Sequence, residues 1–333
     1  MNLTARFCTA MVFVLSAHFA VAQNKPADAV PKKNTPAKKK PAAPAPTEYA
    51  KTVPKPTVSE MKYGEHQRHV IDFWKAKSDK PTPVVLFIHG GGWMNGSKET
   101  INRVLNVQEL LDAGIAVAAI NYRLIPQATA EGMTPPVSGP LRDAARAVQF
   151  LRSKAGEWNI DPQRLGLSGS SAGACSSLWL AFHDDLADPE SGDPIARLST
   201  RPLCAAVLGA QTTLDPKQAK EWLPNSTYGG HAFGKKNFAE ALADRENLMP
   251  WIRQYSPYAL VSKDDSPVAL FYVNTPEMGK AQKDPTHSAN HGIGLQQRCK
   301  SLKVTCDVIH PGIKNPPFKS ITEYLIAKLE TRP

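Results

Sequence analysis

The sequence predicts an α/β fold, with a mostly parallel sheet covered by helices on both faces. Short, continuous apolar runs bounded by Gly or Pro recur along the chain, which is typical of strands buried on both faces. Segments with helical length and periodicity separate these runs. Strands that alternate with helices in this way pair in parallel, because each helix carries the chain back across a face of the sheet.

The predicted elements follow one another in a regular order. A strand is expected where apolar residues run together, and a helix where they recur every third or fourth position. Strands are expected over 84–88, 115–120, 164–168, 205–208, 268–274 and 304–309, and helices over 100–113, 141–154, 172–182, 288–301 and 319–329. An irregular insertion rich in Trp, Tyr, Pro and Gly is expected near 211–262, over one edge of the sheet.

The start of the chain is expected to lie outside this domain. Residues 1–22 have a secretory signal's features: an apolar run, then Ala at positions 20 and 22 for cleavage. The run is shorter than the roughly 20 apolar residues of a membrane span, which favours cleavage over an uncleaved anchor. Residues 23–58 are rich in Pro, Ala and Lys, and predict a disordered linker. The folded domain is then 59–333.

Charge is distributed unevenly along the chain. The net charge is +10, but residues 23–56 hold eight Lys, one Asp and one Glu. The expected domain is therefore only mildly basic, and nothing in it argues for a nucleic-acid partner. The linker is either a flexible spacer or an electrostatic tether to an anionic envelope polymer or membrane surface. Export predicts a secreted or periplasmic protein with no transmembrane span after cleavage.

Four cysteines remain after the expected cleavage. An oxidising compartment lets cysteines pair. Cys299 and Cys306 flank a short helix-to-strand connection and are the favoured pair, with buried free thiols as the alternative. No Cys/His cluster has the spacing of metal ligands, so neither a metal nor another cofactor is expected.

The strongest local signal is the stretch 169–173, which reads Gly-Ser-Ser-Ala-Gly and fits the pattern G-x-S-x-G. It follows a predicted strand and opens a predicted helix. In that setting small flanking residues allow a sharp turn, so that the serine hydroxyl projects from the edge of the sheet. Ser171 is therefore the predicted nucleophile, and a Gly/Ser turn without chemistry is the alternative.

A second signal is the stretch 89–93, His-Gly-Gly-Gly-Trp, directly after the strand expected over 84–88. Three consecutive glycines leave backbone N–H groups uncovered by side chains. Such groups can stabilise a developing oxyanion, and losing one donor typically raises the barrier by about 3–4 kcal/mol. A flexible turn is the alternative, but two such motifs at strand ends, in this order, favour chemistry.

These motifs carry a family resemblance, which also includes Asn-Tyr-Arg-Leu at 121–124 and Asp-Pro at 161–162. The chain resembles α/β-hydrolase-fold carboxylesterases of the hormone-sensitive-lipase-like and bacterial feruloyl or acetyl-xylan esterase-like groups, from about Tyr63 to Leu329. The resemblance implies an oxyanion hole and a structural acid before the serine turn. Its oxyanion donors would be the N–H groups of Gly91, Gly92 and Ala172, and the structural acid would be Asp143.

The catalytic acid should follow the serine, and the histidine should follow the acid. After the strand expected over 268–274, Asp284 precedes a predicted helix in a context that resembles the family's acid. Glu277 is nearer the strand in a less matching context. Asp284 is therefore the predicted acid, and a solvated helix cap is its alternative role.

The general base is harder to assign. Relatives in this group usually have a histidine where Asn315 falls, and an amide cannot take and return a proton near neutral pH. His287, in the same loop as the predicted acid, is the predicted base. His310 and the absence of any base are the main alternatives, and His291 and His89 are less favoured.

The preferred function is hydrolysis of a carboxylic ester outside the cytoplasm. The resemblance implies a small-molecule or polysaccharide ester substrate, such as an acetylated or feruloylated polysaccharide. One alternative is a catalytically impaired binding protein that kept the fold and lost its base, as Asn315 indicates. Another is a peptidase-like hydrolase with the same serine turn. Aromatic residues of the insertion are expected either to contact substrate or to pack the insertion: Trp222, Tyr228, Trp251, Tyr255 and Tyr258.

Overall fold

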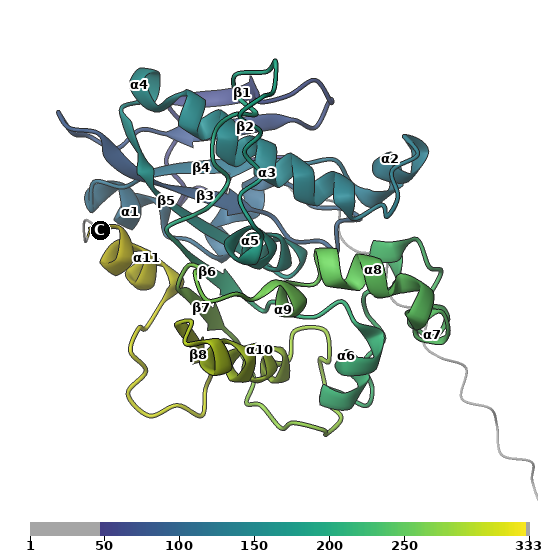
Figure 1. Ribbon diagram of the computed structural model, residues 1–333. Helices are drawn as coiled ribbons and strands as arrows, with labels where there is room; N and C mark the ends of the chain where they lie inside the picture. The colour runs from purple at the N-terminus through teal and green to yellow at the C-terminus, as the bar shows by residue number, and fades with distance from the viewer. Residues whose placement is uncertain (1–46, 331–333) are drawn as a thin grey trace, which may run out of the picture. The chain divides into compact units, whose positions relative to one another are not determined.

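An eight-stranded sheet forms the centre of the protein in the computed structural model, which describes residues 47–330 (Figure 1). The strand order is β1-β2-β4-β3-β5-β6-β7-β8, with antiparallel pairing at β1–β2 and β2–β4 and parallel pairing elsewhere. The strands are β1 (Val58–Lys62), β2 (Val70–Trp74), β3 (Thr82–Ile88), β4 (Ala116–Ile120), β5 (Ile160–Ser170), β6 (Cys204–Leu208), β7 (Val268–Phe271) and β8 (Cys306–Ile309).

Helices connect the strands and cover the sheet. They are η1 (Lys98–Arg103), α1 (Val107–Asp112), α2 (Ile125–Ala130), α3 (Ser138–Ser153), α4 (Ala155–Trp158), α5 (Ala172–Phe182), α6 (Pro216–Trp222), η2 (Gly230–Phe233), α7 (Phe238–Ala243), α8 (Arg245–Tyr255), α9 (Pro257–Leu260), α10 (Ala289–Leu302) and α11 (Ile321–Glu330). The predicted arrangement of strands alternating with helices is confirmed from β3 onwards.

Side chains alternate along β3 and divide the core into two halves. Val84, Leu86 and Ile88 pack on one face with residues of α3, α5 and α10. Val85 and Phe87 pack on the other face with residues of α1 and α11. Because β3 is buried on both faces, its sequence is a continuous apolar run, which is the pattern that predicted it.

Three local predictions differ from the structure. β1 and β2 were not expected, and they add an antiparallel edge to the sheet. The helix expected over 100–113 is instead the 3-10 helix η1 followed by α1, which begins at the Asn106 cap. The insertion near 211–262 is not irregular. It forms α6 to α9, because Asp215 and Asn237 cap helices there.

The insertion packs onto the sheet's helices. α9 contacts α5, and α6 contacts α10; α6, α7 and α8 lie at the right of Figure 1, with α5 near its centre. Its aromatic side chains mostly pack among themselves or against the domain. The ring pairs are Trp222–Tyr258, Tyr255–Trp179, Trp251–Phe233 and Tyr228–His231.

The predicted signal at 1–22 and most of the predicted linker lie outside the described residues. Inside them, ordered contacts begin before the expected boundary at residue 59. Tyr49 donates its hydroxyl hydrogen bond to Asp72 (2.7 Å), and Trp74 donates to the Pro54 carbonyl (2.7 Å). The end of the linker segment therefore packs on β2. None of the helices in the described part of the chain combines the length and apolarity that crossing a bilayer requires.

The four cysteines expected to remain after cleavage are free and buried. Cys299 lies in α10 and Cys306 begins β8, and the neighbouring Cys299 thiol, together with burial, raises the pKa of Cys306. The sequence left a disulfide and buried thiols open for this pair, and the structure has thiols.

Candidate active site

Ser171 stands at the sharp turn between β5 and α5. Its backbone has φ 52° and ψ −120°, a strained conformation for a residue with a side chain. The Ser171 N–H donates to the Leu208 carbonyl at the end of the neighbouring strand β6 (2.9 Å). The turn therefore holds the serine at the carboxyl edge of the parallel strands, with its hydroxyl facing away from the sheet interior towards the loop after β7.

The flanking glycines are required by close approach to the neighbouring strand. A Cβ atom on Gly173 would lie 2.0 Å from the Ile88 carbonyl oxygen, and one on Gly169 would lie 2.6 Å from the same oxygen. Any larger residue at either position would push α5 away from β3. The motif at 169–173 thus has a steric cause.

The glycine loop after β3 lies directly beside the serine. A Cβ atom on Gly90 would come within 2.8 Å of the Ser170 carbonyl oxygen and 3.3 Å of the Ser171 Cβ. Gly91 and Gly92 have φ of +105° and +65°, backbone geometry that glycine adopts without strain. The Ala172 N–H belongs to the first turn of α5, where N–H groups have no intrahelical partner. The structure therefore places the glycine loop beside Ser171 through Gly90, and Ala172 directly after it.

Buried side chains behind the glycine loop fix its path. His89 Nδ1–H donates to the Gly90 carbonyl (2.7 Å), which leaves Nε2 to accept from Arg68 (3.3 Å). Burial lowers the pKa of His89 to about 3, so the ring is neutral. The Tyr122 ring stacks on His89, and its hydroxyl donates to the His89 carbonyl (2.7 Å). His89 is thus a support for the loop.

Sequence reasoning missed the roles of Arg68 and Tyr122. Arg68 also donates to the carbonyls of Tyr122 (2.7 Å) and Gly96 (2.9 Å). It therefore links both ends of the glycine loop, at His89 and Gly96, to the segment that follows β4. Tyr122 lies in the Asn-Tyr-Arg-Leu stretch that carried the resemblance, and that stretch was the only signal for it. Nothing in the local sequence marks Arg68.

Ser171, His287 and Asp284 form one chain of hydrogen bonds. The distance from His287 Nε2 to Ser171 Oγ is 2.9 Å, and His287 Nδ1 lies 2.8 Å from Asp284 Oδ2. A carboxylate only accepts, so Nδ1 carries the proton and Nε2 accepts from the serine hydroxyl. The structure therefore brings together the three side chains that the sequence predicted as nucleophile, base and acid.

Asp284 is ionised although part of its side chain is buried. Burial raises its pKa, but the hydrogen bond and charge of His287, with the N–H groups of His287 and Thr286, outweigh burial and leave the pKa lowered. Side-chain exposure is 55% for Asp284 and 38% for His287. Water therefore screens part of the interaction between these two side chains.

The alternative candidates point elsewhere. His310 Nδ1 accepts a local hydrogen bond from the Gly312 N–H (3.2 Å). Asn315 is exposed on the loop after β8, with φ +55°. His291 is buried in α10, and burial lowers its pKa to about 4. Glu277 is exposed and pairs with Lys280 (3.6 Å). The imidazole that contacts the serine is therefore His287.

Asp143 has a structural environment. Its carboxylate lies 2.9 Å from His69 Nε2 and 3.1 Å from Arg123 Nη2, and it accepts the Arg123 N–H (2.9 Å). These contacts tie α3 to the connection after β4. The resemblance implied this kind of role for Asp143.

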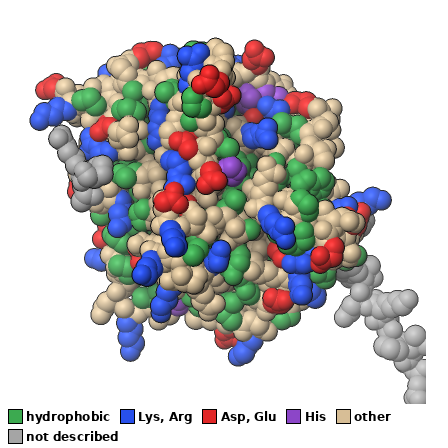
Figure 2. Space-filling view, in the orientation of Figure 1, with side chains coloured by type: hydrophobic (Ala, Val, Ile, Leu, Met, Phe, Trp, Pro, Cys, Tyr) green, Lys and Arg blue, Asp and Glu red, His purple; other side chains and the backbone are tan. Residues whose placement is uncertain are grey.

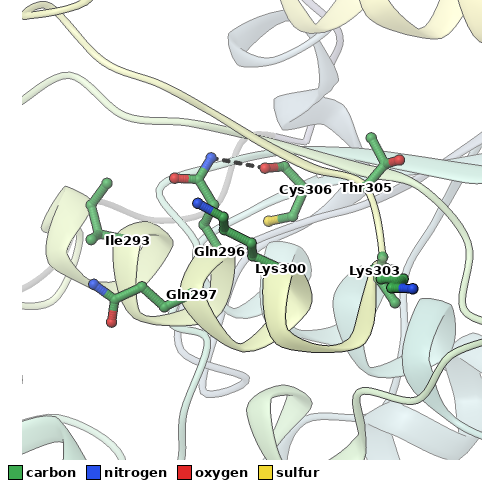
Figure 3. Close-up of a pocket in the computed structure, with 8 residues that line it drawn as sticks. Ile293, Gln296, Gln297, Lys300, Lys303, Thr305 and Cys306 are labelled. Carbon is green, nitrogen blue, oxygen red and sulfur yellow. Dashed lines mark hydrogen bonds between the residues drawn. The ribbon is translucent and has the colours of Figure 1, made fainter.

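One hollow on the protein lies away from these residues. A cavity of about 600 Å³ sits between the outer side of α10 and the start of β8 (Figure 3). Its lining is mostly polar, with Gln296, Gln297, Lys300 and Lys303 among the residues labelled, and none of the predicted site residues contributes to it.

On the face shown in Figure 2, positive and negative side chains are interspersed. Within residues 47–330, no group of three or more His, Cys, Asp or Glu side chains is placed to hold a metal.

Known proteins resemble part of the chain, and the family match includes Ser171 and ends before Asp284 and His287. The BD-FAE family matches residues 71–282. A probable isoprenylcysteine alpha-carbonyl methylesterase, ICMEL1, from Arabidopsis thaliana is 31% identical over 140 residues, which cover 42% of this chain and 28% of that protein. Carboxylesterase NlhH of Mycobacterium tuberculosis strain H37Rv is 29% identical over 123 residues, 37% of this chain and 35% of NlhH. The chain therefore spans about a third or less of the length of either relative.

A solved structure resembles a larger part of the chain. A truncated form of carbohydrate esterase from gut microbiota superposes with a TM-score of 0.61 and 18% sequence identity, covering 79% of this chain and 90% of that one. At this level of identity the likeness establishes the arrangement of helices and strands. It agrees with the mostly parallel sheet described above.

Proposed function

The chain belongs to the BD-FAE family and has the α/β-hydrolase fold, and from that premise we propose that it hydrolyses carboxylic esters with Ser171 as its nucleophile. One observation carries the proposal: the unbroken hydrogen-bond chain from Ser171 Oγ through His287 to Asp284. A serine hydroxyl becomes a competent nucleophile when an adjacent base can take its proton. His287 is that base in this proposal.

In the acylation step, Ser171 Oγ attacks the acyl carbon while its proton passes to His287 Nε2. Asp284 accepts the Nδ1 hydrogen bond throughout, so it keeps the required tautomer and stabilises the imidazolium. The N–H groups of Gly91, Gly92 and Ala172 stabilise the oxyanion. The imidazolium then gives its proton to the departing alkoxide, which leaves as an alcohol, and the acyl group remains on Ser171.

In the deacylation step, water replaces the alcohol. His287 takes a proton from the water as the water oxygen attacks the acyl carbon, and the same oxyanion donors act again. The bond to Ser171 Oγ breaks, and His287 returns the proton to that oxygen. The products are a carboxylic acid and the starting enzyme.

The substrate class and the location are also part of the proposal. The solved relative is a carbohydrate esterase, which supports an esterified saccharide as substrate. The signal features at 1–22 support a secreted or periplasmic protein, in a compartment where such polysaccharide esters occur. The basic linker after the signal would tether the enzyme to an anionic envelope polymer there.

A fluorophosphonate probe and p-nitrophenyl acetate test the proposal together. The wild-type protein is expected to be labelled on Ser171 and to turn over the ester, and Ser171→Ala is expected to lose both. The matched control is Ser170→Ala, the neighbouring serine outside the hydrogen-bond chain. Turnover in Ser171→Ala equal to the wild type would refute the proposal.

An impaired binding protein remains the second candidate because Asn315 stands where relatives usually have histidine. The contact between His287 and Ser171 weighs against it, since an imidazole reaches the serine from another loop. A wild-type protein that neither labels nor turns over esters, yet binds an esterified polysaccharide, would favour this candidate.

A further inference from the structure

One loop carries both the acid and the base. The segment from the end of β7 to the start of α10 contains Asp284 and His287, and it includes no helix or strand of its own. Much of it is exposed. Loops of this length without secondary structure are uncommon in compact domains and are generally mobile. The alignment of Asp284, His287 and Ser171 therefore depends on contacts that hold this loop in place.

Two side-chain amides hold the backbone on either side of the His287 ring. Asn274 Nδ2 donates to the His287 carbonyl (3.0 Å), and Asn274 Oδ1 accepts the Ala289 N–H (2.8 Å). Gln211 Nε2 donates to the Thr286 carbonyl (2.7 Å). The carbonyls of two successive residues, 286 and 287, are thus held by the amides of Gln211, which lies outside the loop, and of Asn274, at the start of the loop.

Gln211 also links the loop to the floor beneath the ring. Its Nε2 donates to the Gly209 carbonyl as well (3.1 Å), and its side chain is buried at 1% exposure. Gly209 lies directly below the base, because a Cβ atom there would be 3.4 Å from the His287 Cβ. Gln211 therefore links Gly209, which lies beneath the imidazole, to Thr286, the residue before His287.

A third amide holds the same loop farther from the base. Asn225 Nδ2 donates to the Gln282 carbonyl (2.8 Å), and Asn225 Oδ1 accepts the Gln282 N–H (3.1 Å). This reciprocal pair anchors the loop before Asp284. It provides a matched comparison, since it is the same chemistry on the same loop without contact to residues 286–289.

We propose that Asn274 and Gln211 are positioning residues, which hold the His287 imidazole between Asp284 and Ser171 through the backbone of residues 286–289. The inference rests on the proposed function, because it assigns these residues to the same hydrogen-bond chain. Neither side chain touches the reacting atoms. Their contribution is orientation, and a displacement of about 1 Å at a catalytic group can lower the rate about 100-fold.

Steady-state kinetics with p-nitrophenyl acetate tests the proposal, with rates normalised to the fraction of protein that the fluorophosphonate probe titrates. Asn274→Ala and Gln211→Ala are expected to lower kcat about 10- to 100-fold with little change in KM. Asn225→Ala is expected to stay within about two-fold of the wild type. Asn274→Asp separates the two Asn274 bonds: it keeps the acceptor for Ala289 and loses the donor to His287, so kcat is expected to fall.

A proton NMR spectrum provides a readout that does not depend on turnover. The His287 Nδ1 proton, bonded to Asp284, is expected at low field, and its assignment follows from its loss in Asp284→Ala. Asn274→Ala and Gln211→Ala are expected to shift or broaden this resonance, and Asn225→Ala to leave it unchanged. A merely structural role would lower thermal stability in all three variants and move the resonance in none.

The outcomes separate this inference from the proposed function. If Asn274→Ala and Gln211→Ala match Asn225→Ala in kcat and in the resonance, the positioning role is refuted, while loss of turnover in Ser171→Ala leaves the esterase proposal standing. If the wild type neither labels nor turns over the ester, the esterase proposal fails, and the resonance alone decides whether the two amides orient His287.

Discussion

The two halves of the candidate site are built in different ways. The glycine loop and the serine turn stand at the ends of β3 and β5, two neighbouring strands at the centre of the sheet. Their supports are buried rings and backbone contacts, such as His89, which is fully buried. The acid and base stand on one long, largely exposed loop after β7, and side-chain amides hold it.

The difference shows two sources of precision in one site. In the first half, steric demand fixes the geometry: Gly173 approaches the Ile88 carbonyl so closely that no side chain fits. In the second half, hydrogen bonds from side-chain amides to the backbone fix the geometry. We therefore expect small changes to disrupt the first half through clashes and the second through lost orientation.

Among the substitutions that test this difference between the two halves, the largest loss of activity is expected at Gly91. A Cβ atom there would lie 2.2 Å from the Asn95 carbonyl oxygen, at φ +105°, so Gly91→Ala must rearrange the loop. We expect kcat for p-nitrophenyl acetate to fall about 10²- to 10³-fold, the cost of losing an oxyanion donor.

Gly92→Ala is the matched control for this prediction. Its φ of +65° lies in the left-handed region open to other residues at a cost of roughly 1–2 kcal/mol, and its nearest new contact would be 3.7 Å from Tyr228 Oη. A smaller loss of kcat is expected. Equal losses in the two variants would show that clashes do not govern this half.

A smaller loss is expected from Asp284→Asn. The amide keeps the shape of the acid but cannot stabilise the imidazolium, and it can hold the ring in the wrong tautomer. Because Asp284 is half exposed, water screens part of its effect. We expect kcat to fall about 100-fold with KM nearly unchanged. A change confined to KM would assign Asp284 to substrate binding instead.

The buried side chains of His89 and His291 are expected to make the folding stability of the protein depend on pH. Burial lowers the pKa of His89 to about 3 and that of His291 to about 4, below the unfolded value of about 6.5. Between these values the unfolded chain binds more protons, so stability is complete above about pH 6.5 and is lost as the pH falls towards 4. Denaturant unfolding should show this slope, and His291→Gln should reduce it by about one proton.

An unchanged slope in His291→Gln would contradict that assignment. The absolute stability of the variant is not the readout, since the substitution also alters packing against Trp222. His89→Gln is the corresponding variant for the glycine-loop half.

The smallest effects are expected on the loop after β8. Asn315 is exposed and His310 makes a local bond to Gly312, whereas the Ser171 hydroxyl bonds to His287. Asn315→Ala and His310→Ala are expected to leave kcat within about two-fold of the wild type. A large loss of kcat in His310→Ala would assign the base to the loop after β8 and contradict the contrast between the two halves of the site.

The sequence predicted the half built on strand ends better than the other half. β3 was readable because burial on both faces leaves a continuous apolar run, and the serine turn because close approach demands glycine. β2 was missed because Asp72, paired with Lys98, interrupts its apolar run. β1 was missed because most of it is exposed.

The acid–base half was predictable in its residues and not in its supports. The loop offered Asp284 and His287 close together, but only the folded path of the chain decides which imidazole reaches the serine. Asn274 and Gln211 carried no signal, because an amide that bonds a distant backbone carbonyl leaves no local pattern. Such supports are properties of the tertiary structure.

The measurement that tests the account most directly is the rate at which a fluorophosphonate labels Ser171 in His287→Ala, compared with the wild type and with His310→Ala. If His287 takes the serine proton, labelling in His287→Ala should slow by about 10³-fold or more, and His310→Ala should match the wild type. Labelling of His287→Ala at the wild-type rate would contradict the assignment of the base.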